Sequence, residues 1–388
     1  MNFEYTEEQR QLADSLGKFL ANHYDFEKRK AIVASASGMS DAVWAAFAEM
    51  GLTAIALPEA DGAEGGFGGG AMDLMAAMEA CGQALVVEPL LDNIGLGARL
   101  VARAGSAAQR AAWLPGFIDG SVKLAFAGLE PGRRYELDPQ ATRARGTREG
   151  YVLDGAKCVV IGAASATRLI VSARSDAGDG GDAGASLFVV DPKAPGVTLN
   201  PSRTVDGQRA ADVRFDKVNL GAEALLGKAG GALPFIEEAT DFATALLCAQ
   251  AIGAMQYAND ATLEYLKTRK QFGKPIGVNQ VLQHRMVEMV IHAEQARSMA
   301  ILAASKVDRA AQAGHTPEDA RERMRAVSAA KVKIADAARH VSQEAVQLHG
   351  GMGMTEELKI SHTFRLLTMI AQRFGDADHH LERYAALT

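Results

Sequence analysis

The chain has 388 residues, 48% of them hydrophobic and 23% charged, and a formal net charge of −6. This composition excludes an intrinsically disordered chain, and because Lys and Arg are dispersed among acids it argues against a nucleic-acid-binding surface. The three cysteines, Cys81, Cys158 and Cys248, lie far apart without CxxC spacing, which argues against a disulfide framework or a zinc site, so we expect no bound metal.

Residues 1–118 have helical periodicity and are predicted to form an N-terminal helical domain. Thr6 and Gln9 form a capping box, and Leu16 and Leu20 follow on one helix face. The acidic N-terminus lacks the apolar core of a secretory signal, and no stretch reaches about 18 apolar residues, so we expect a cytoplasmic protein without membrane insertion. The glycine-rich run 62–70 is similar to a phosphate-binding loop, but no Lys follows it, and an inter-helix loop is the preferred interpretation.

Residues 119–228 alternate with the period of β-strands and are predicted to form a middle, antiparallel β domain. Short apolar runs such as YVLDGAKCVVIG and SLFVVD are separated by turn residues. We expect a hairpin turn at Asp154-Gly155. The acidic run between Arg174 and Ser186 lacks the glutamate that ends a calcium loop, so a solvated hairpin loop is preferred there.

Residues 229–388 return to long helical patterns, over 233–268, 278–313, 317–348 and 356–372, and are predicted to form a four-helix bundle that carries the oligomer contacts. Thr316-Pro317 indicates a helix start and Gly350-Gly351 a helix stop. The whole is an α+β fold. No Rossmann fingerprint occurs, which disfavours a nicotinamide enzyme of the usual kind.

Two segments of this last region have residue types suited to a nucleotide cofactor. YLKTRKQFGKPI (265–276) ends a helix with Arg269 and Lys270, whose donors could hold a diphosphate. QLHGGMGM (347–354) ends another helix in glycines that let a backbone approach a cofactor closely. Basic residues and glycines are also typical of ordinary helix C-termini, so each segment alone leaves both interpretations open.

Together the two segments resemble the R-x-x-F-G-x-P/L-I…Q and Q-x-x-G-G motifs of the acyl-CoA dehydrogenase family, and the order of the three domains is similar too. The resemblance implies FAD as cofactor, an acyl-CoA substrate and an electron-accepting flavoprotein. It also implies that one group of residues contacts the ADP half of FAD. In the family, this FAD is bound by the neighbouring subunit. These residues are Arg269, Gln271, Phe272, Gln280, Gln347, Gly350 and Gly351.

Other positions depart from the family pattern. The position of the family's catalytic glutamate, counted from Gly351, falls on Phe374, and an alternative base position on the preceding long helix falls on Ala243. Asp376 and Asp241 lie close by in sequence as weak candidates. The flavin-ring segments T-E-P-x-x-G-S-D and K-x-W-I-T are replaced by LEPGRRY (129–135) and KCVVI (157–161).

Three functional hypotheses remain. The preferred one is the subunit of a heteromeric α2β2 acyl-CoA dehydrogenase that lacks the base, similar to the small-subunit type found in pimeloyl-CoA dehydrogenase and expected to act in fatty acid or dicarboxylic acid metabolism. The second is a competent homo-oligomer with an unorthodox base, and the third is a non-catalytic binding or scaffold protein. Arg133 and Arg134 could meet a distal carboxylate of a dicarboxylyl-CoA, but surface positions are the preferred interpretation for both.

Overall fold

The computed structural model describes residues 5–58, 65–175 and 183–388. The chain divides into two compact units, each formed by separate stretches of sequence. We call Met1–Ala31, Gly70–Val86 and Thr244–Thr388 the helical unit, and Ile32–Gly69 with Val87–Ala243 the sheet unit. The domain boundaries expected at 118 and 228 stay a prediction.

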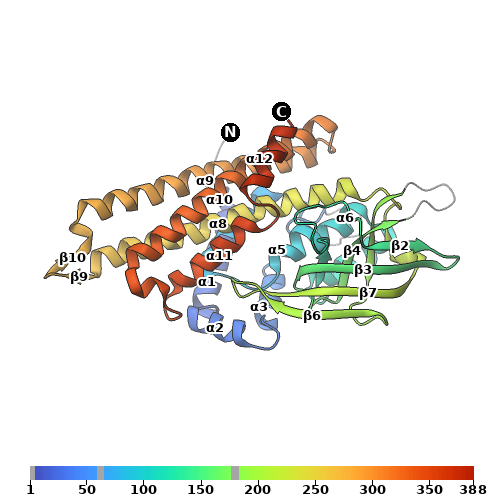
Figure 1. The fold of residues 1–388 in the computed structure, drawn as a ribbon, viewed down its shortest axis with the longest axis horizontal. Coiled ribbons are helices and arrows are strands. Elements are labelled where there is room, and N and C mark those ends of the chain that lie inside the picture. Colours follow the sequence, from blue (N-terminus) through green and yellow to red (C-terminus); the bar gives the residue numbers. More distant parts are fainter. Residues whose placement is uncertain (1–4, 59–64, 176–182) are drawn as a thin grey trace. The chain divides into compact units, whose positions relative to one another are not determined.

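The helical unit contains most of the long helices, which Figure 1 labels. The residues of α8 before Thr244 and of α2 after Ala31 are assigned to the sheet unit. Its elements are α1 (Glu7–His23), α2 (Phe26–Ala34), α4 (Ala71–Ala84), α8 (Leu233–Thr268), β9 (Lys270–Gln271), β10 (Lys274–Pro275), η3 (Ile276–Val278), α9 (Gln280–Gln312), α10 (Pro317–His349), η4 (Gly350–Met354), α11 (Lys359–Gln372) and α12 (Ala377–Ala386). The sequence pattern did not predict α12 or the small hairpin β9–β10.

Local signals fix where several of these helices begin and end. The predicted capping box is confirmed, because the Thr6 hydroxyl accepts from the backbone N–H of Gln9 and the Gln9 side chain accepts from the N–H of Thr6. Thr316 caps α10 and Pro317 occupies its first turn, as expected. α10 ends at Gly350, whose φ of +60° is reached without a steric penalty only by glycine.

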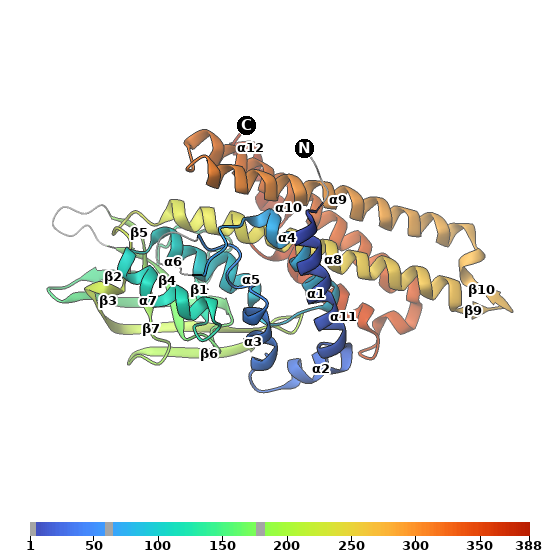
Figure 2. The same ribbon diagram turned by 180° about the vertical axis from the view of Figure 1, so that it is seen from behind.

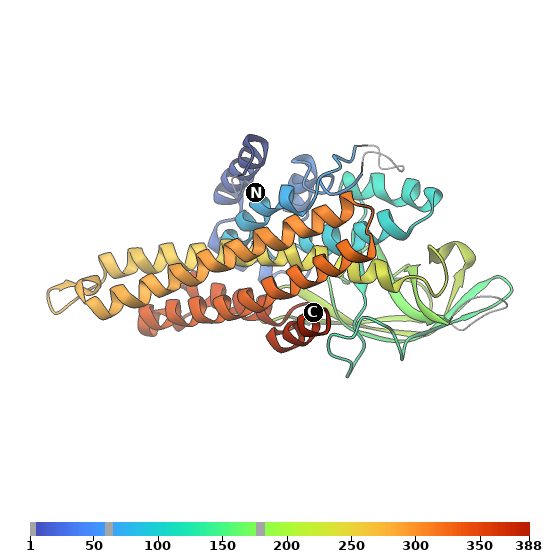
Figure 3. The same cartoon turned by 90° about the horizontal axis from the view of Figure 1, so that it is seen from above.

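The helices of this unit pack through small residues. α10 packs against α9, α11 and α12, and Figure 3 shows α9 and α10 as an antiparallel pair. On the other side, seen in Figure 2, α1 packs on α4, which in turn contacts α9. A Cβ on Gly82 would lie 2.0 Å from the backbone oxygen of Gln250, so α4 and α8 cross at a distance that only glycine permits. No helix within the described ranges is both long and apolar enough to cross a membrane.

The sheet unit combines short helices with an eight-stranded sheet of order β6-β7-β3-β2-β4-β5-β8, with β1 also paired to β4. Its elements are α3 (Asp41–Glu49), α5 (Leu90–Asp92), the π-helix η1 (Asn93–Ala98), α6 (Arg99–Ala104), α7 (Ala107–Ile118), β1 (Leu124–Ala127), β2 (Arg143–Gly146), β3 (Gly150–Ile161), β4 (Arg168–Ser175), β5 (Gly184–Val190), β6 (Val197–Arg203), β7 (Arg209–Gly221), η2 (Ala222–Ala224) and β8 (Leu225–Leu226).

Most strand pairings are antiparallel as predicted, but β1 and β2 both run parallel to β4. Strands β4 and β5 pair antiparallel. Residues 176–182 of the acidic run between them are outside the described part of the chain, as are residues 59–64, which include the start of the glycine-rich run. Gly65–Gly69 lie in no helix or strand, as expected of a loop.

The expected hairpin turn at Asp154-Gly155 is wrong. Both residues lie inside β3, where Asp154 is opposite Arg143 of β2 and Gly155 is opposite Phe215 of β7. The register shifts between Leu153 and Gly155, so the glycine with its φ of +141° forms a β-bulge. A Cβ there would lie 2.6 Å from Cα of Thr142, which explains the glycine without a turn.

Candidate functional site

The first predicted cofactor segment forms one end of the helical unit, where β9 and β10 are drawn in Figure 1. α8 ends at Thr268, and the N–H of Arg269 donates to the carbonyl of Tyr265 at 2.8 Å. The N–H of Ile276 then donates to the carbonyl of Arg269 at 2.9 Å, which closes the hairpin onto the helix end. The segment is therefore a fixed structure and not a frayed helix terminus.

The turn of this hairpin holds a phenylalanine in an unfavourable state. Phe272 and Gly273 both have positive φ, at +52° and +80°, as in the two-residue turns that favour Asn-Gly. Left-handed backbone costs an L-residue about 1 kcal/mol or more, and the ring of Phe272 is fully exposed. Neither feature helps the isolated chain, so the ring is suited to contact another molecule.

The polar residues predicted to hold the cofactor diphosphate are on this same exposed end. Arg269, Gln271 and Gln280 are all exposed. Gln271 donates through Nε2 to the carbonyl of Lys270. Within the described ranges, no carboxylate pairs with Arg269. Its guanidinium donors therefore remain available for an anionic group such as a carboxylate or a phosphate, whose geometry a guanidinium matches.

The second predicted segment forms the end of α10 and the 3₁₀ turn η4. Gln347 is exposed at the last turn of α10. A Cβ added to Gly350 or Gly351 would meet no atom within 4 Å, so the backbone here has an open side. This fits close approach by a large cofactor.

The structure brings the two segments together through a ring pair that sequence reasoning missed. The rings of Tyr265, on α8, and His349, on α10, lie 4.4 Å apart at their centroids with planes inclined by 30°. His349 is buried and burial lowers its pKa. Its place within QLHGG was the one available sequence signal, since the two residues are 84 positions apart.

Apolar side chains gather around the first segment. We call the exposed residues of the hairpin, η3 and the first half of α9 the tip surface; they are Phe272, Val278, Val281, Val287, Val290 and Ile291. Met352 and Met354 of η4 are exposed as well. Exposed apolar residues in such a group are typical of a protein–protein contact.

The position of the family's catalytic glutamate lies in the turn that joins α11 to α12. Phe374 has a φ of +59°, and the guanidinium of Arg373 lies 4.7 Å from its ring centroid. Asp376, one of the two weak base candidates, is the N-cap of α12 and accepts the N–H of His379 at 2.9 Å. A capping carboxylate already has a structural role.

Two buried side chains hydrogen-bond to backbone carbonyls of this turn. Lys331 of α10 donates through Nζ to the carbonyls of Ala371 and Gly375, at 3.1 and 2.6 Å. His380 is 3.1 Å through Nε2 from the carbonyl of Phe374. Burial lowers the pKa of Lys331 to about 8, and burial together with Lys331 lowers the pKa of His380 to about 3, so the imidazole is neutral and donates.

In the sheet unit, the alternative base position is closed by packing. Ala243 is fully buried, and a Cβ on Gly95 of the π-helix η1 would lie 3.0 Å from the Ala243 Cβ. Asp241, the second weak candidate, is buried and already has an interaction partner. Glu238, one turn earlier, forms a buried ion pair with Arg99. The carboxylates around position 243 are thus engaged in structure.

The segments that replace the family's flavin-ring motifs rest on a buried ion pair. Lys157 and Glu130 are both buried and lie 3.2 Å apart. Lys157 also donates to the Gly128 carbonyl and to the Ser172 hydroxyl. Burial lowers the pKa of Lys157 to about 8 although Glu130 opposes this shift.

Glu130 is held mainly by backbone. Its carboxylate accepts the N–H groups of Gln140, Ala141 and Thr142 at 2.7 to 2.9 Å. Burial alone would raise its pKa, but these bonds and the Lys157 ammonium lower it to about 2. The pair therefore links the LEPGRRY loop to strand β3 in a fully hydrogen-bonded arrangement.

The side chains that this arrangement presents are not those of the family motifs. Val159 lies in a second bulge of β3 with a φ of +51°, a rare conformation for a β-branched residue, and is exposed. Arg133 and Arg134 are exposed, as the preferred sequence interpretation expected.

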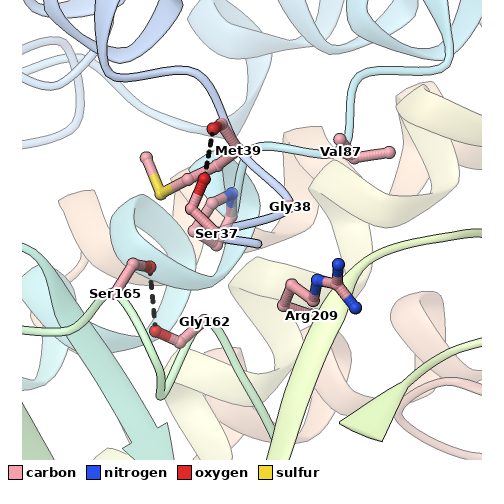
Figure 4. A pocket seen from close by; sticks show the side chains of 8 residues that line it. Ser37, Gly38, Met39, Val87, Gly162, Ser165 and Arg209 are labelled. Carbon is pink, nitrogen blue, oxygen red and sulfur yellow. Dashed lines mark hydrogen bonds between the residues drawn. The ribbon is translucent and has the colours of Figure 1, made fainter. Parts of the chain in front are cut away.

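A small recess in the sheet unit lies beside the end of β3. It encloses about 200 Å³, part of it open to solvent. Its lining is Ser37, Gly38, Met39, Val87, Pro89, Gly162, Ser165 and Arg209. Figure 4 shows the hydroxyls of Ser37 and Ser165 bonded to the carbonyls of Met39 and Gly162, so both hydroxyls have hydrogen-bond partners within the lining.

In the described ranges no group of three or more His, Cys, Asp or Glu side chains could hold a metal, and the three cysteines are free thiols.

Three family models match the chain in order. They are the acyl-CoA dehydrogenase N-terminal domain over residues 6–121, the middle domain over 125–218 and the C-terminal domain over 233–385. The predicted order of a helical, a β and a second helical domain is therefore confirmed.

Curated relatives agree with these matches. The chain is 30% identical to acryloyl-CoA reductase (NADH) of Anaerotignum propionicum, with 82% of this chain and 79% of the relative covered. It is 29% identical to acyl-CoA dehydrogenase fadE12 of Mycobacterium bovis, with 93% and 90% covered. Among solved structures, a variant of Tcur3481-Tcur3483, a steroid ACAD, is 29% identical with a TM-score of 0.84 and covers 98% of this chain and 97% of its own.

Proposed function

Because the chain belongs to the acyl-CoA dehydrogenase family, we propose that it is an FAD-dependent subunit of a heteromeric enzyme that desaturates an acyl-CoA thioester between Cα and Cβ. In this proposal it lends diphosphate contacts to the FAD of a sister subunit, which carries the base. The observation that carries the proposal is the exposed end of the helical unit, where Arg269, with no carboxylate partner among the described residues, lies beside the tip surface.

The contacts for the cofactor come from both predicted segments. Arg269, Gln271, Phe272 and Gln280 lie on the first segment and its neighbour α9, and all four are exposed. Gln347, Gly350 and Gly351 lie on the second, where the bare backbone leaves room. Residues on an exposed end can enclose a cofactor only if another chain contacts the opposite side of that cofactor. The site is therefore complete only in an oligomer.

The missing base indicates a sister chain and not a second copy. Phe374 cannot take a proton, Ala243 is packed against η1, and Asp376 caps a helix. FAD supplies the chemistry of accepting the β-hydrogen as hydride in this family, but the α-proton requires a carboxylate. In this proposal the chain positions and shields the cofactor and the sister chain removes the proton.

The finer identity of the enzyme is part of the proposal. Likeness to the small subunit of pimeloyl-CoA dehydrogenase favours a dicarboxylyl-CoA substrate, whereas the steroid ACAD relative favours a bulky acyl group. An electron-accepting flavoprotein is implied by the family likeness, and we expect the complex in the cytoplasm.

The test compares the chain alone with the chain co-expressed with a sister subunit that carries the family glutamate. Alone, it is expected to hold little FAD and to show no appreciable dehydrogenation of a panel of saturated, dicarboxylyl and steroid acyl-CoAs. Both flavin absorbance and turnover with an artificial electron acceptor should appear in the co-expressed complex. General base catalysis contributes about 10²- to 10⁴-fold, which sets the size of the difference.

Other outcomes select the other hypotheses. A yellow homo-oligomer with rapid turnover would contradict the proposal, and loss of that turnover in Asp376→Asn or Asp241→Asn would identify an unorthodox base. A stable assembly that binds neither FAD nor acyl-CoA would favour the scaffold. A stable monomer with stoichiometric FAD would contradict the inference that the exposed tip needs a second chain to bind the cofactor.

A further inference from the structure

The ring pair of Tyr265 and His349 occupies a position that no cofactor motif accounts for. Tyr265 is the residue whose carbonyl accepts the N–H of Arg269, so its backbone sets where the first segment leaves α8. His349 immediately precedes Gly350, so its backbone sets where the second segment leaves α10. The stacked rings join these two points directly.

The pair is enclosed on its other side as well. A Cβ on Gly353 would lie 3.0 Å from the His349 Cβ and 2.6 Å from the carbonyl of Val346, so η4 folds tightly over the histidine. The Nδ1 atom of His349 lies 2.8 Å from the carbonyl of Ala345 within its own helix. These contacts restrict the orientation of the imidazole that meets the tyrosine ring.

We infer that the Tyr265–His349 ring pair is the positioning element that sets the spacing between the Arg269 hairpin and the Gly350-Gly351 turn. This spacing is the distance between the two segments proposed to contact the FAD diphosphate. The inference rests on the proposed function for its consequence, although the spacing itself is a property of this chain. A planar ring is what the geometry requires at position 349, because the two rings meet with centroids 4.4 Å apart and planes inclined by 30°, while the Nδ1 bond of His349 is to its own helix.

Hydrogen exchange of the apo chain tests the spacing without any cofactor. His349→Ala should speed exchange of the Ile276 and Arg269 N–H groups, which donate to the carbonyls of Arg269 and Tyr265. His349→Phe should restore the slow rate because a ring is back in place. Tyr265→Ala should act like His349→Ala. Equal exchange in all variants, or failure of His349→Phe to restore it, would overturn the inference.

FAD affinity in the co-expressed complex tests the consequence. His349→Ala should weaken FAD binding by about 3- to 10-fold, as expected for an aromatic pair, while His349→Phe stays within about 2-fold. Arg269→Ala is measured in parallel. If Arg269→Ala also leaves affinity unchanged, the proposed function fails while the exchange result stands; if Arg269→Ala weakens binding and His349→Ala does not, the positioning role is overturned.

Discussion

The exposed end of the helical unit and the Glu130–Lys157 region of the sheet unit are opposites. At the tip, Arg269, Gln271, Phe272 and Gln280 are exposed, and within the described part of the chain no carboxylate pairs with Arg269. Around Lys157, the buried support is fully hydrogen-bonded, but the residues that it presents are Val159 and two arginines in place of the family's flavin-ring contacts.

The comparison separates buried residues that stabilise the fold from exposed residues that would contact a ligand or a partner. Removal of one partner of a buried ion pair leaves an uncompensated buried charge. The fold therefore depends on Glu130 and Lys157 being present together, whichever residues the nearby surface carries. Exposed residues such as Arg269 contribute little to the stability of the chain, and their identity is explained only by a ligand or a partner. Stability and cofactor binding should therefore respond to substitutions in different regions.

The largest expected effect is on stability. Lys157→Met should lower the free energy of unfolding by about 3–5 kcal/mol, since it leaves the Glu130 carboxylate buried without its cation. The midpoint of urea unfolding measures this. Lys28→Met is the matched control, because Lys28 forms an exposed pair with Asp25 and should change stability by less than about 0.5 kcal/mol. Equal effects of the two variants would break the contrast between the regions.

Acid should weaken the same region. The pKa of Glu130 lies at about 2, below its ordinary value near 4.5, so its contribution is present above about pH 4.5 and is lost as the pH falls through 2. The contribution is about 3 kcal/mol at most. Glu130→Gln should flatten this part of the stability–pH curve, and an unchanged acid limb would show that other groups control it.

Arg269→Ala should act on the cofactor and not on the fold. Loss of a charge-assisted bond to phosphate costs about 1.5–3 kcal/mol, or roughly 10- to 150-fold in FAD affinity. Flavin content of the purified complex and urea unfolding of the chain are measured together. Lys267→Ala removes an equally exposed charge from the same helix end and should leave flavin content unchanged.

The smallest expected effect has opposite signs in the chain and in its assembly. Phe272→Asn should stabilise the chain by about 0.5–1 kcal/mol, because asparagine tolerates the left-handed turn better. The same change should weaken the oligomer in sedimentation, since an exposed ring is lost from the tip surface. A stabilised chain with unchanged assembly would show that the ring has no partner.

Much of the fold was predictable because its signals are local. Thr6, Thr316 and Gly350 mark helix ends through their own side chains or φ values. Asp154-Gly155 shows the limit of such signals: a turn and a bulge need the same glycine, and only pairing with β2 and β7 decides between them.

The candidate site divides in the same way. The sequence identified the motif residues of the tip, but not the side chains that support them, because Tyr265 and His349, or Lys331 and His380, meet only after folding. Asp376 was a reasonable base candidate by position, yet its geometry as the cap of α12 could be read only from the structure.

The turn around Phe374 has a consequence for redesign of the enzyme. Lys331 and His380 hold it through the carbonyl oxygens of Ala371, Phe374 and Gly375, so these bonds do not depend on the side chain at 374, although the Arg373 guanidinium packs on the Phe374 ring. Such a position is open to change: a single codon can remove or install a carboxylate there while the scaffold stays the same. In a library screened for acyl-CoA oxidation by this chain, Phe374→Glu is accordingly the first substitution to include.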